Sequence, residues 1–193
     1  LQKMDDLQKF LVEKESITHT FLVPPQFGAL LEMSDIKERN FSSLKAILSA
    51  GSPLRLDMKK KILDVLTEKL FELYGFSEGF ATMLKPEYQR NKFGTVGTPV
   101  LGFEIKILND SGEECDVGQA GEIAGYGAGM MKEYFNEKEL TEQLIWRDNR
   151  GKTFIKSGDI GKLDEEGFLT ILDRKKDMII SGGLNVFPVD IEE

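Results

Sequence analysis

Apolar residues near the start of the chain recur at helical spacing and then give way to a strand-like run. Met4, Leu7 and Leu11 lie three or four positions apart among charged residues, which predicts a surface helix over 4–15. The stretch 18–25, THTFLVPP, is a short apolar run that ends at two prolines, and it predicts a strand. A helical pattern resumes in the following FGALLEM.

The alternation of strand and helix continues to about residue 70. The run 44–54, LKAILSAGSPL, predicts a strand that leads into a loop. Residues 57–70 predict an amphipathic helix that begins at a cap, Asp57. Its apolar stripe consists of Met58, Ile62, Leu66 and Leu70. Because strands alternate with amphipathic helices, we expect a mixed α/β sheet layer over residues 1–94.

After residue 90 the pattern changes to short strands separated by glycine turns. GFEIKIL alternates apolar and polar positions and is followed by the turn sequence NDSG, which predicts a hairpin. GEIAGYG, TFIKSGD and GFLTILD are further strand-like runs, and one helix is predicted near NEKELTEQLI. We therefore expect an antiparallel or mixed β-rich unit over 95–172. DMIISGG then predicts another strand, and FPVDIEE the start of a helix.

The charge balance narrows the classes of partner. The chain has 193 residues, with 25 Lys and Arg against 33 Asp and Glu, and a formal net charge of −8. This balance repels a phosphate backbone, so we expect no nucleic-acid partner. Phosphate can still be bound locally by backbone amides, by one arginine or by a metal ion.

Cysteine usage and hydropathy suggest a compartment. Cys115 is the only cysteine, which excludes an intramolecular disulfide and fits a reducing compartment, so we expect a cytoplasmic protein. No apolar run approaches the roughly 20 residues of a membrane-spanning helix, so no transmembrane segment is expected. The chain starts at Leu1 and ends where a helix is predicted to begin, so we expect a piece of a longer protein.

Three familiar motifs fail on spacing or number. RGKTF contains Gly-Lys-Thr, but the glycine that a phosphate loop requires five residues before Gly151 is Trp146. In GYGAGMM the third glycine of a dinucleotide fingerprint would fall at Met130. His19 is the only histidine, and a Ser-His-Asp triad would have to use it. We interpret His19 as a core or edge residue of a strand.

Three polar groups at turns have two readings each. Ser77 and Glu78, in ELYGFSEG, are typical of a solvated loop or the start of a helix. A strand is predicted to end at Ser157-Gly158-Asp159, where Asp159 either accepts hydrogen bonds from a ribose diol or caps a turn, and this stretch alone favours the cap. Arg174 either forks onto phosphate or ribose oxygens or forms a salt bridge within DRKKD.

Taken in order, these stretches resemble the adenylate-forming superfamily, which includes acyl-CoA synthetases, aryl-CoA ligases, firefly-type luciferases and peptide-synthetase adenylation domains. The resemblance covers nearly the whole chain from ITHTFLVPP onward, in the family's order and spacing. The final run is most similar to the fatty-acyl and aryl-CoA ligase branch. The stretches that carry it are SAGSPL (49–54), YGFSE (74–78), GEIAGYG…MMKEYFN (121–136), SGDIG (157–161) and DRKKDMIISGGLNVFPVDIEE (173–193).

The resemblance implies an enzyme that activates a carboxylic acid with MgATP to an acyl-adenylate and transfers the acyl group to CoA. It implies that Ser77 binds a phosphate oxygen and that Glu78 holds Mg²⁺. The implied nucleotide-binding residues are Ala50, Gly51, Ser52, Tyr74 (stacked on adenine), Gly75, Ser77, Asp159 (on the ribose hydroxyls) and Arg174. Asp173 would lie at the hinge to a small C-terminal domain, the β-rich unit would be a distorted barrel-like subdomain, and 173–193 would begin the small domain.

Two departures and two absences qualify this prediction. Position 77 is Ser where Thr is commoner, and Glu133 stands where many members have Gly. The family's phosphate loop with its lysine and its C-terminal catalytic lysine are not in the chain, so we expect the chain alone to be unable to complete adenylation. Two alternatives stand beside this reading. One is an adenylation enzyme with a carrier-protein or other acceptor, and the other is a non-catalytic nucleotide-binding module.

Overall fold

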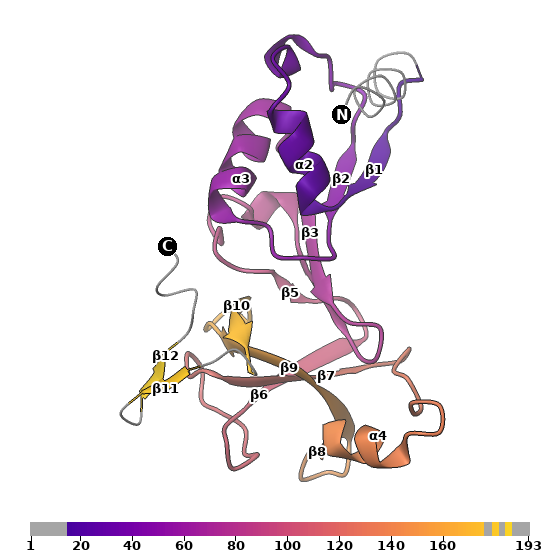
Figure 1. The fold of residues 1–193 in the computed structure, drawn as a ribbon, viewed down its shortest axis with the longest axis vertical. Helices are drawn as coiled ribbons and strands as arrows, with labels where there is room; N and C mark the ends of the chain where they lie inside the picture. The colour runs from indigo at the N-terminus through magenta and orange to yellow at the C-terminus, as the bar shows by residue number, and fades with distance from the viewer. Residues whose placement is uncertain (1–14, 176–178, 182–183, 187–193) are drawn as a thin grey trace. The chain divides into compact units, whose positions relative to one another are not determined.

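The computed structural model describes residues 15–175, 179–181 and 184–186, with side chains up to Lys175 (Figure 1). The predicted N-terminal helix, apart from Glu15, and the helix predicted in FPVDIEE lie outside these residues. The chain forms two compact units. The first consists of Leu1–Tyr74 and Leu84–Gly94, and the second of Gly75–Met83 and Thr95–Glu193.

The first unit is built on parallel strands with helices packed beside them (Figure 1). The strands are β1 (His19–Leu22), β2 (Ala46–Ser49) and β3 (Leu70–Gly75). The helical segments are α2 (Pro24–Leu31), η2 (Ile36–Glu38), α3 (Leu56–Lys61), η3 (Ile62–Leu66) and η4 (Pro86–Tyr88). Apolar side chains of the helices and strands share one core, which includes Phe27, Leu30, Ile47, Ile62 and Leu70.

The helix after β2 differs from the predicted one at both ends. Its N-cap is Arg55, which makes no capping hydrogen bond through its side chain, and Asp57 lies in the first turn instead of at the cap. The prediction that Asp57 is the cap is therefore wrong. The helix also closes with a π-helical turn at Leu66, and Leu70 begins a strand rather than ending the stripe.

A buried ion pair ties α3 to β3. The Lys59 ammonium lies 2.8 Å from the Glu72 carboxylate, and the two side chains are 1% and 10% exposed. Lys59 Nζ also donates a hydrogen bond of 2.8 Å to the carbonyl of Phe93. Burial raises the pKa of Glu72, and the neighbouring Lys59 opposes that rise. Because an unpaired charge is costly in an apolar interior, the pair fixes how the helix lies on the strand that leads to Tyr74.

The second unit is antiparallel. It contains the pairing of β4 (Ala81–Leu84) with β5 (Thr98–Pro99) and a curled sheet in the order β10-β9-β7-β6, with β8 also paired to β9 (Figure 1). The elements of that sheet and its helix are β6 (Phe103–Leu108), β7 (Gly121–Gly127), α4 (Lys138–Leu144), β8 (Ile145–Arg147), β9 (Thr153–Leu163) and β10 (Leu169–Arg174). A final hairpin joins β11 (Ile179–Ser181) to β12 (Leu184–Val186). The predicted combination of a mixed α/β sheet layer and a β-rich part is confirmed.

The long strand β9 contains an irregularity that the sequence did not predict. On one side β7 pairs with it at Lys156 and again at Ile160, so Ser157, Gly158 and Asp159 bulge out opposite a single residue of β7. On the other side β8 ends its pairing at Ile155, and β10 begins at Asp159. The prediction that the strand ends at Asp159 is wrong, because the chain passes through the bulge and resumes pairing. None of the described helices is long and apolar enough to cross a membrane.

Candidate functional site

The predicted nucleotide-binding residues of the first unit lie at one edge of its parallel sheet. Ser49 is opposite Leu22 of β1 and Glu72 of β3, so the loop after β2 leaves the sheet at the same edge as Tyr74 at the end of β3. That loop carries the predicted residues Ala50, Gly51 and Ser52, of which Ala50 is buried and Ser52 exposed. The edge formed by the carboxyl ends of parallel strands is where open α/β sheets bind ligands.

The turn between β3 and β4 carries Ser77 and Glu78. It is closed by the Phe76 amide, which donates to the carbonyl of Phe80 at 3.2 Å, and by the Gly79 amide, which donates to the carbonyl of Phe76 at 3.2 Å. Gly75 has an intramolecular reason to be glycine, because a Cβ there would overlap the carbonyl oxygen of Phe80. Ser77 is exposed and Glu78 half-buried, so both side chains are accessible to a ligand.

This turn is held on β7 by packing, and on the loop after β7 by one backbone hydrogen bond. The Phe80 ring is 2% exposed and fills the space that a Cβ on Gly125 would occupy. The Met131 amide donates to the carbonyl of Glu78 at 2.8 Å. Because β7 also pairs with β9, the turn and the bulge are attached to neighbouring strands of the same sheet.

The Glu78 side chain has a partner that reasoning from the sequence missed. The Tyr134 hydroxyl donates a hydrogen bond of 2.6 Å to Oε1 of Glu78. This bond, with smaller contributions from burial and the nearby charge, raises the pKa of Tyr134. Tyr134 lies inside the family-like stretch MMKEYFN, which is the one signal that singles it out. No spacing rule connects it to a carboxylate 56 positions earlier.

The bulge of β9 brings Asp159 and Arg174 together. They are opposite each other in the β9–β10 register, and Nε of Arg174 lies 3.5 Å from Oδ1 of Asp159. Asp159 is 18% exposed and Arg174 66% exposed. The Asp159 amide donates a hydrogen bond of 3.0 Å to Oγ of Ser157. The Asp159 carboxylate thus faces the guanidinium of Arg174 on the neighbouring strand.

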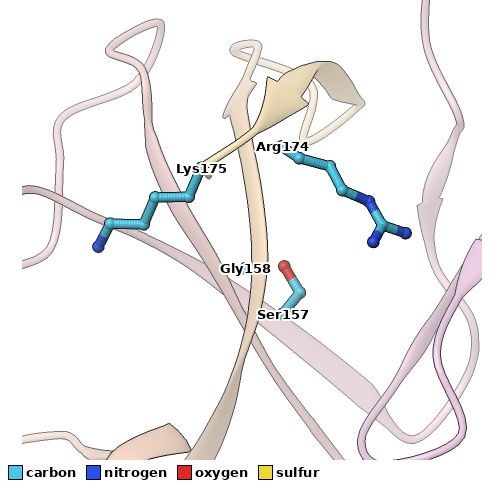
Figure 2. Close-up of a pocket in the computed structure, with 4 residues that line it drawn as sticks. All are labelled: Ser157, Gly158, Arg174 and Lys175. Carbon is cyan, nitrogen blue, oxygen red and sulfur yellow. The ribbon is translucent and has the colours of Figure 1, made fainter. Parts of the chain in front are cut away.

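An open pocket of about 380 Å³ lies beside this pair, lined by Ser157, Gly158, Arg174 and Lys175. Figure 2 shows the Arg174 and Lys175 side chains leaving the chain in opposite directions, with the Ser157 hydroxyl on the Arg174 side. The Lys175 amide donates to the carbonyl of Gly158 at 2.8 Å, and its ammonium lies 2.8 Å from Glu122. The Ser157 hydroxyl and the Arg174 guanidinium therefore line the pocket at the bulge of β9, which lies between the residues that pair with β8 and those that pair with β10.

Arg174 has an acidic neighbour on the adjacent strand. Among the described residues its ion pair is with Asp159, and Asp177 of DRKKD lies outside these residues. Asp173, the predicted hinge residue, accepts a hydrogen bond of 2.7 Å from the Arg174 amide through Oδ1. An ion pair that is largely exposed on the arginine side is weak, so a ligand anion or diol can displace it at low cost.

The donor set fits a divalent cation only together with a nucleotide. Among the described residues, no three His, Cys, Asp or Glu side chains gather to hold a metal ion. Glu78 supplies one carboxylate on an accessible turn. Mg²⁺ is commonly bound by one or two carboxylates together with substrate phosphates and water. The residues present therefore fit a cation that arrives with a polyphosphate.

Comparisons with known proteins agree on one family. The model of the AMP-binding enzyme family matches residues 2–135. The 2-succinylbenzoate–CoA ligase of Bacillus subtilis (strain 168) is 35% identical over 186 residues, which are 94% of this chain and 36% of that protein. A long-chain-fatty-acid–CoA ligase of the same organism is 35% identical over 196 residues, which are 100% of this chain and 34% of that protein.

Solved structures give the same picture. An amide bond synthetase from Marinactinospora thermotolerans superposes with a TM-score of 0.87 at 28% identity and covers 97% of this chain and 38% of that one. The O-succinylbenzoate coenzyme A synthetase of Bacillus subtilis, in complex with ATP and magnesium ion, superposes with a TM-score of 0.83 at 34% identity. The match covers 98% of this chain and 38% of that one. The chain thus spans little more than a third of the length of these relatives.

Proposed function

The chain belongs to the family of AMP-binding enzymes, and from this premise we propose that it is the nucleotide-binding part of an ATP-dependent acid–CoA ligase. The observation that carries the proposal is the bulge of β9, which sets Asp159 opposite Arg174 beside an open pocket. The unit that holds this pair also holds the turn of Ser77 and Glu78. The relatives named as CoA ligases support the same reaction class.

The reaction has two halves. The substrate carboxylate attacks the α-phosphorus of ATP, forming an acyl-adenylate and releasing pyrophosphate. The CoA thiol then attacks the acyl carbonyl, forming a thioester and releasing AMP. Negative charge accumulates on the phosphates in the first half, so donors and positive charge near the phosphates lower its barrier.

Each residue has a proposed part in holding the nucleotide. Asp159 accepts hydrogen bonds from the ribose hydroxyls, and Arg174 donates to ribose or phosphate oxygens. Ser77 donates its hydroxyl to a phosphate oxygen. Glu78 holds a magnesium ion, which when bound neutralises phosphate charge. Tyr74 stacks on the adenine above the loop of Ala50, Gly51 and Ser52, and Gly75 keeps the backbone near the ligand free of side chain.

The acid itself is proposed only as a carboxylic acid. The two relatives above are named for different acids, 2-succinylbenzoate and long-chain fatty acids. Their identities to this chain are equal, at 35%. The carboxyl group is therefore the substrate feature that we propose, with ATP, Mg²⁺ and CoA as the other reactants. Asp173 remains the proposed hinge residue.

Replacing the proposed ligand groups tests the function directly. In the full-length protein, we expect Glu78→Ala and Asp159→Ala each to lower the rate of ATP–pyrophosphate exchange by about 100-fold, because a group that faces accumulating charge or orients the nucleotide is lost. Glu165→Ala is the matched control, since it removes an exposed carboxylate in the turn between β9 and β10. Undiminished exchange in both variants would instead indicate a non-catalytic nucleotide-binding module.

A second candidate differs only in the acceptor. The similarity to an amide bond synthetase, with a TM-score of 0.87, favours an enzyme of the same first half-reaction that transfers the acyl group to an amine. Mass spectrometry of products after incubation of the full-length protein with an acid panel, ATP and either CoA or amines decides between them. Thioester products support the CoA ligase, and amides formed without CoA support the second candidate.

A further inference from the structure

We propose that Tyr134 is a positioning residue, which orients the Glu78 carboxylate for the divalent cation that accompanies ATP. The inference rests on the proposed function, because it takes Glu78 as the carboxylate that holds the cation. It adds a second residue to that part of the site, from a segment 56 positions away in the sequence.

The hydrogen bond fixes one oxygen of the carboxylate. The Tyr134 hydroxyl lies 2.6 Å from Oε1 of Glu78, which is within the range of a short charge-assisted bond. An ionised carboxylate has about four acceptor positions, so one donor leaves the others for a further partner. A side chain on a surface turn otherwise samples several rotamers, and holding one of them reduces the entropy lost when the cation binds.

The backbone on both sides of this bond is also held. The Glu78 carbonyl accepts a hydrogen bond of 2.8 Å from the Met131 amide, so the turn and the loop of residues 128–137 are joined by main chain as well as by side chains. The Tyr134 amide donates to Oγ1 of Thr141 at 3.0 Å. Thr141 belongs to α4 and is 4% exposed, and its hydroxyl donates to the carbonyl of Glu137. The tyrosine is therefore attached to a buried point of a helix.

The chemistry of the donor suits a carboxylate that must keep its charge. A phenol donates a hydrogen bond while remaining neutral, so the negative charge of Glu78 stays available to a cation. A lysine or arginine at the same place would orient the carboxylate equally well but would neutralise it.

Binding of a spectroscopic cation tests the inference without turnover. Mn²⁺ is titrated into the full-length protein with α,β-methylene-ATP and followed by electron paramagnetic resonance. We expect Tyr134→Phe to weaken Mn²⁺ binding about 10-fold, the usual cost of losing a hydrogen-bond partner of a metal ligand. Binding of the analogue without metal should not change. Tyr126→Phe is the matched control, since it removes a hydroxyl from a half-buried tyrosine whose ring packs on Phe154.

A double-mutant cycle separates positioning from general destabilisation. In a Glu78→Gln background, Tyr134→Phe should cause no further loss of Mn²⁺ affinity, because the carboxylate that it orients is gone. An equal loss in both backgrounds, or wild-type Mn²⁺ affinity in Tyr134→Phe alone, would overturn the inference while leaving the proposed function intact. Unchanged Mn²⁺ affinity in Glu78→Gln would overturn the metal assignment itself and the inference with it.

Exchange kinetics provide a second readout. The Mg²⁺ concentration that half-saturates ATP–pyrophosphate exchange should rise about 10-fold in Tyr134→Phe, with little change at saturating Mg²⁺. Thermal melting establishes that the variant is folded. If it is not, Tyr134→Trp, which keeps a ring and an N–H donor, is compared with Tyr134→Leu. The inference requires tighter Mn²⁺ binding in the Trp variant, and equal binding would overturn it.

Discussion

The backbone of Gly158 shows how a single residue shapes the candidate site. Its φ is +75°, in the left-handed region that other residues enter at a cost, and it lies in the middle of the β9 bulge. The Gly158 carbonyl accepts a hydrogen bond from the Lys175 amide, and Gly158 also lines the pocket. The positive φ of Gly158 lets the strand bulge here and then continue.

Substitution of Gly158 should cost backbone strain alone, because a Cβ there would have open space around it. We expect Gly158→Ala to lower the free energy of unfolding by about 1–2 kcal/mol. Gly158→Asn should cost less, since Asn tolerates this region better. Thermal denaturation of the full-length protein measures both, with Gly129→Ala as control, where space is also open but φ is not positive. A harmless Gly158→Ala would contradict the positive φ.

At the scale of elements, local periodicity predicted most of the helices and strands, but not β3, β4, β5 and β8, and not where the helix after β2 ends. The end of η3 at Leu66 and the start of β3 at Leu70 both fall inside one apolar stripe of period 3.6. What divides the stripe is the parallel pairing of β3 with β2, from Ile47 opposite Leu70 onward. A sheet neighbour supplies hydrogen bonds that a local pattern cannot reveal.

The Lys59–Glu72 pair should dominate the stability of the α3–β3 contact. We expect Lys59→Met to lower the free energy of local unfolding by about 3–5 kcal/mol, because it leaves the Glu72 carboxylate buried without its cation. The double variant Lys59→Met/Glu72→Leu should recover most of this loss. Native-state hydrogen exchange of the β3 amides is the measurement. A double variant as unstable as the single one would contradict this account.

The same pair gives a pH dependence with a defined sign. Because the pKa of Glu72 is raised in the folded state, that state binds more protons than the unfolded chain at pH values just above 4.5. The contribution of Glu72 to stability is therefore greatest below this window and decreases as pH rises through the raised pKa. Glu72→Gln should remove this decrease in the free energy of unfolding with rising pH. A decrease that persists in the variant must come from other groups.

At the scale of the whole molecule, the chain corresponds to only part of the length of its relatives. It spans 36% of the length of the 2-succinylbenzoate–CoA ligase that it matches. Among the described residues β1 pairs only with β2, and Phe21 on this edge strand is 54% exposed. An edge strand with an exposed aromatic side chain tends to pair with another chain.

We expect the 193-residue chain alone to bind MgATP at least about tenfold more weakly than the full-length protein, a difference of about 1.4 kcal/mol or more. The reason is that the family's phosphate loop and catalytic lysine are not in the chain. Calorimetric titration of both proteins measures the difference. Circular dichroism shows that the chain is folded, and sedimentation shows whether it self-associates. Equal affinities would mean that the chain already holds the complete nucleotide site.

From the amino-acid sequence we could predict the family, the mixed α/β class and most of the helices and strands, because periodicity and motif spacing are local properties, but not the strands β3, β4, β5 and β8. The sequence also nominated Glu78, Asp159 and Arg174. Only the tertiary structure decided that Arg174 faces Asp159 across a bulge, that Tyr134 bonds to Glu78, and that Lys59 is buried with Glu72. These contacts join residues that strand register and packing bring together, and neither is encoded in the spacing of residues along a single segment.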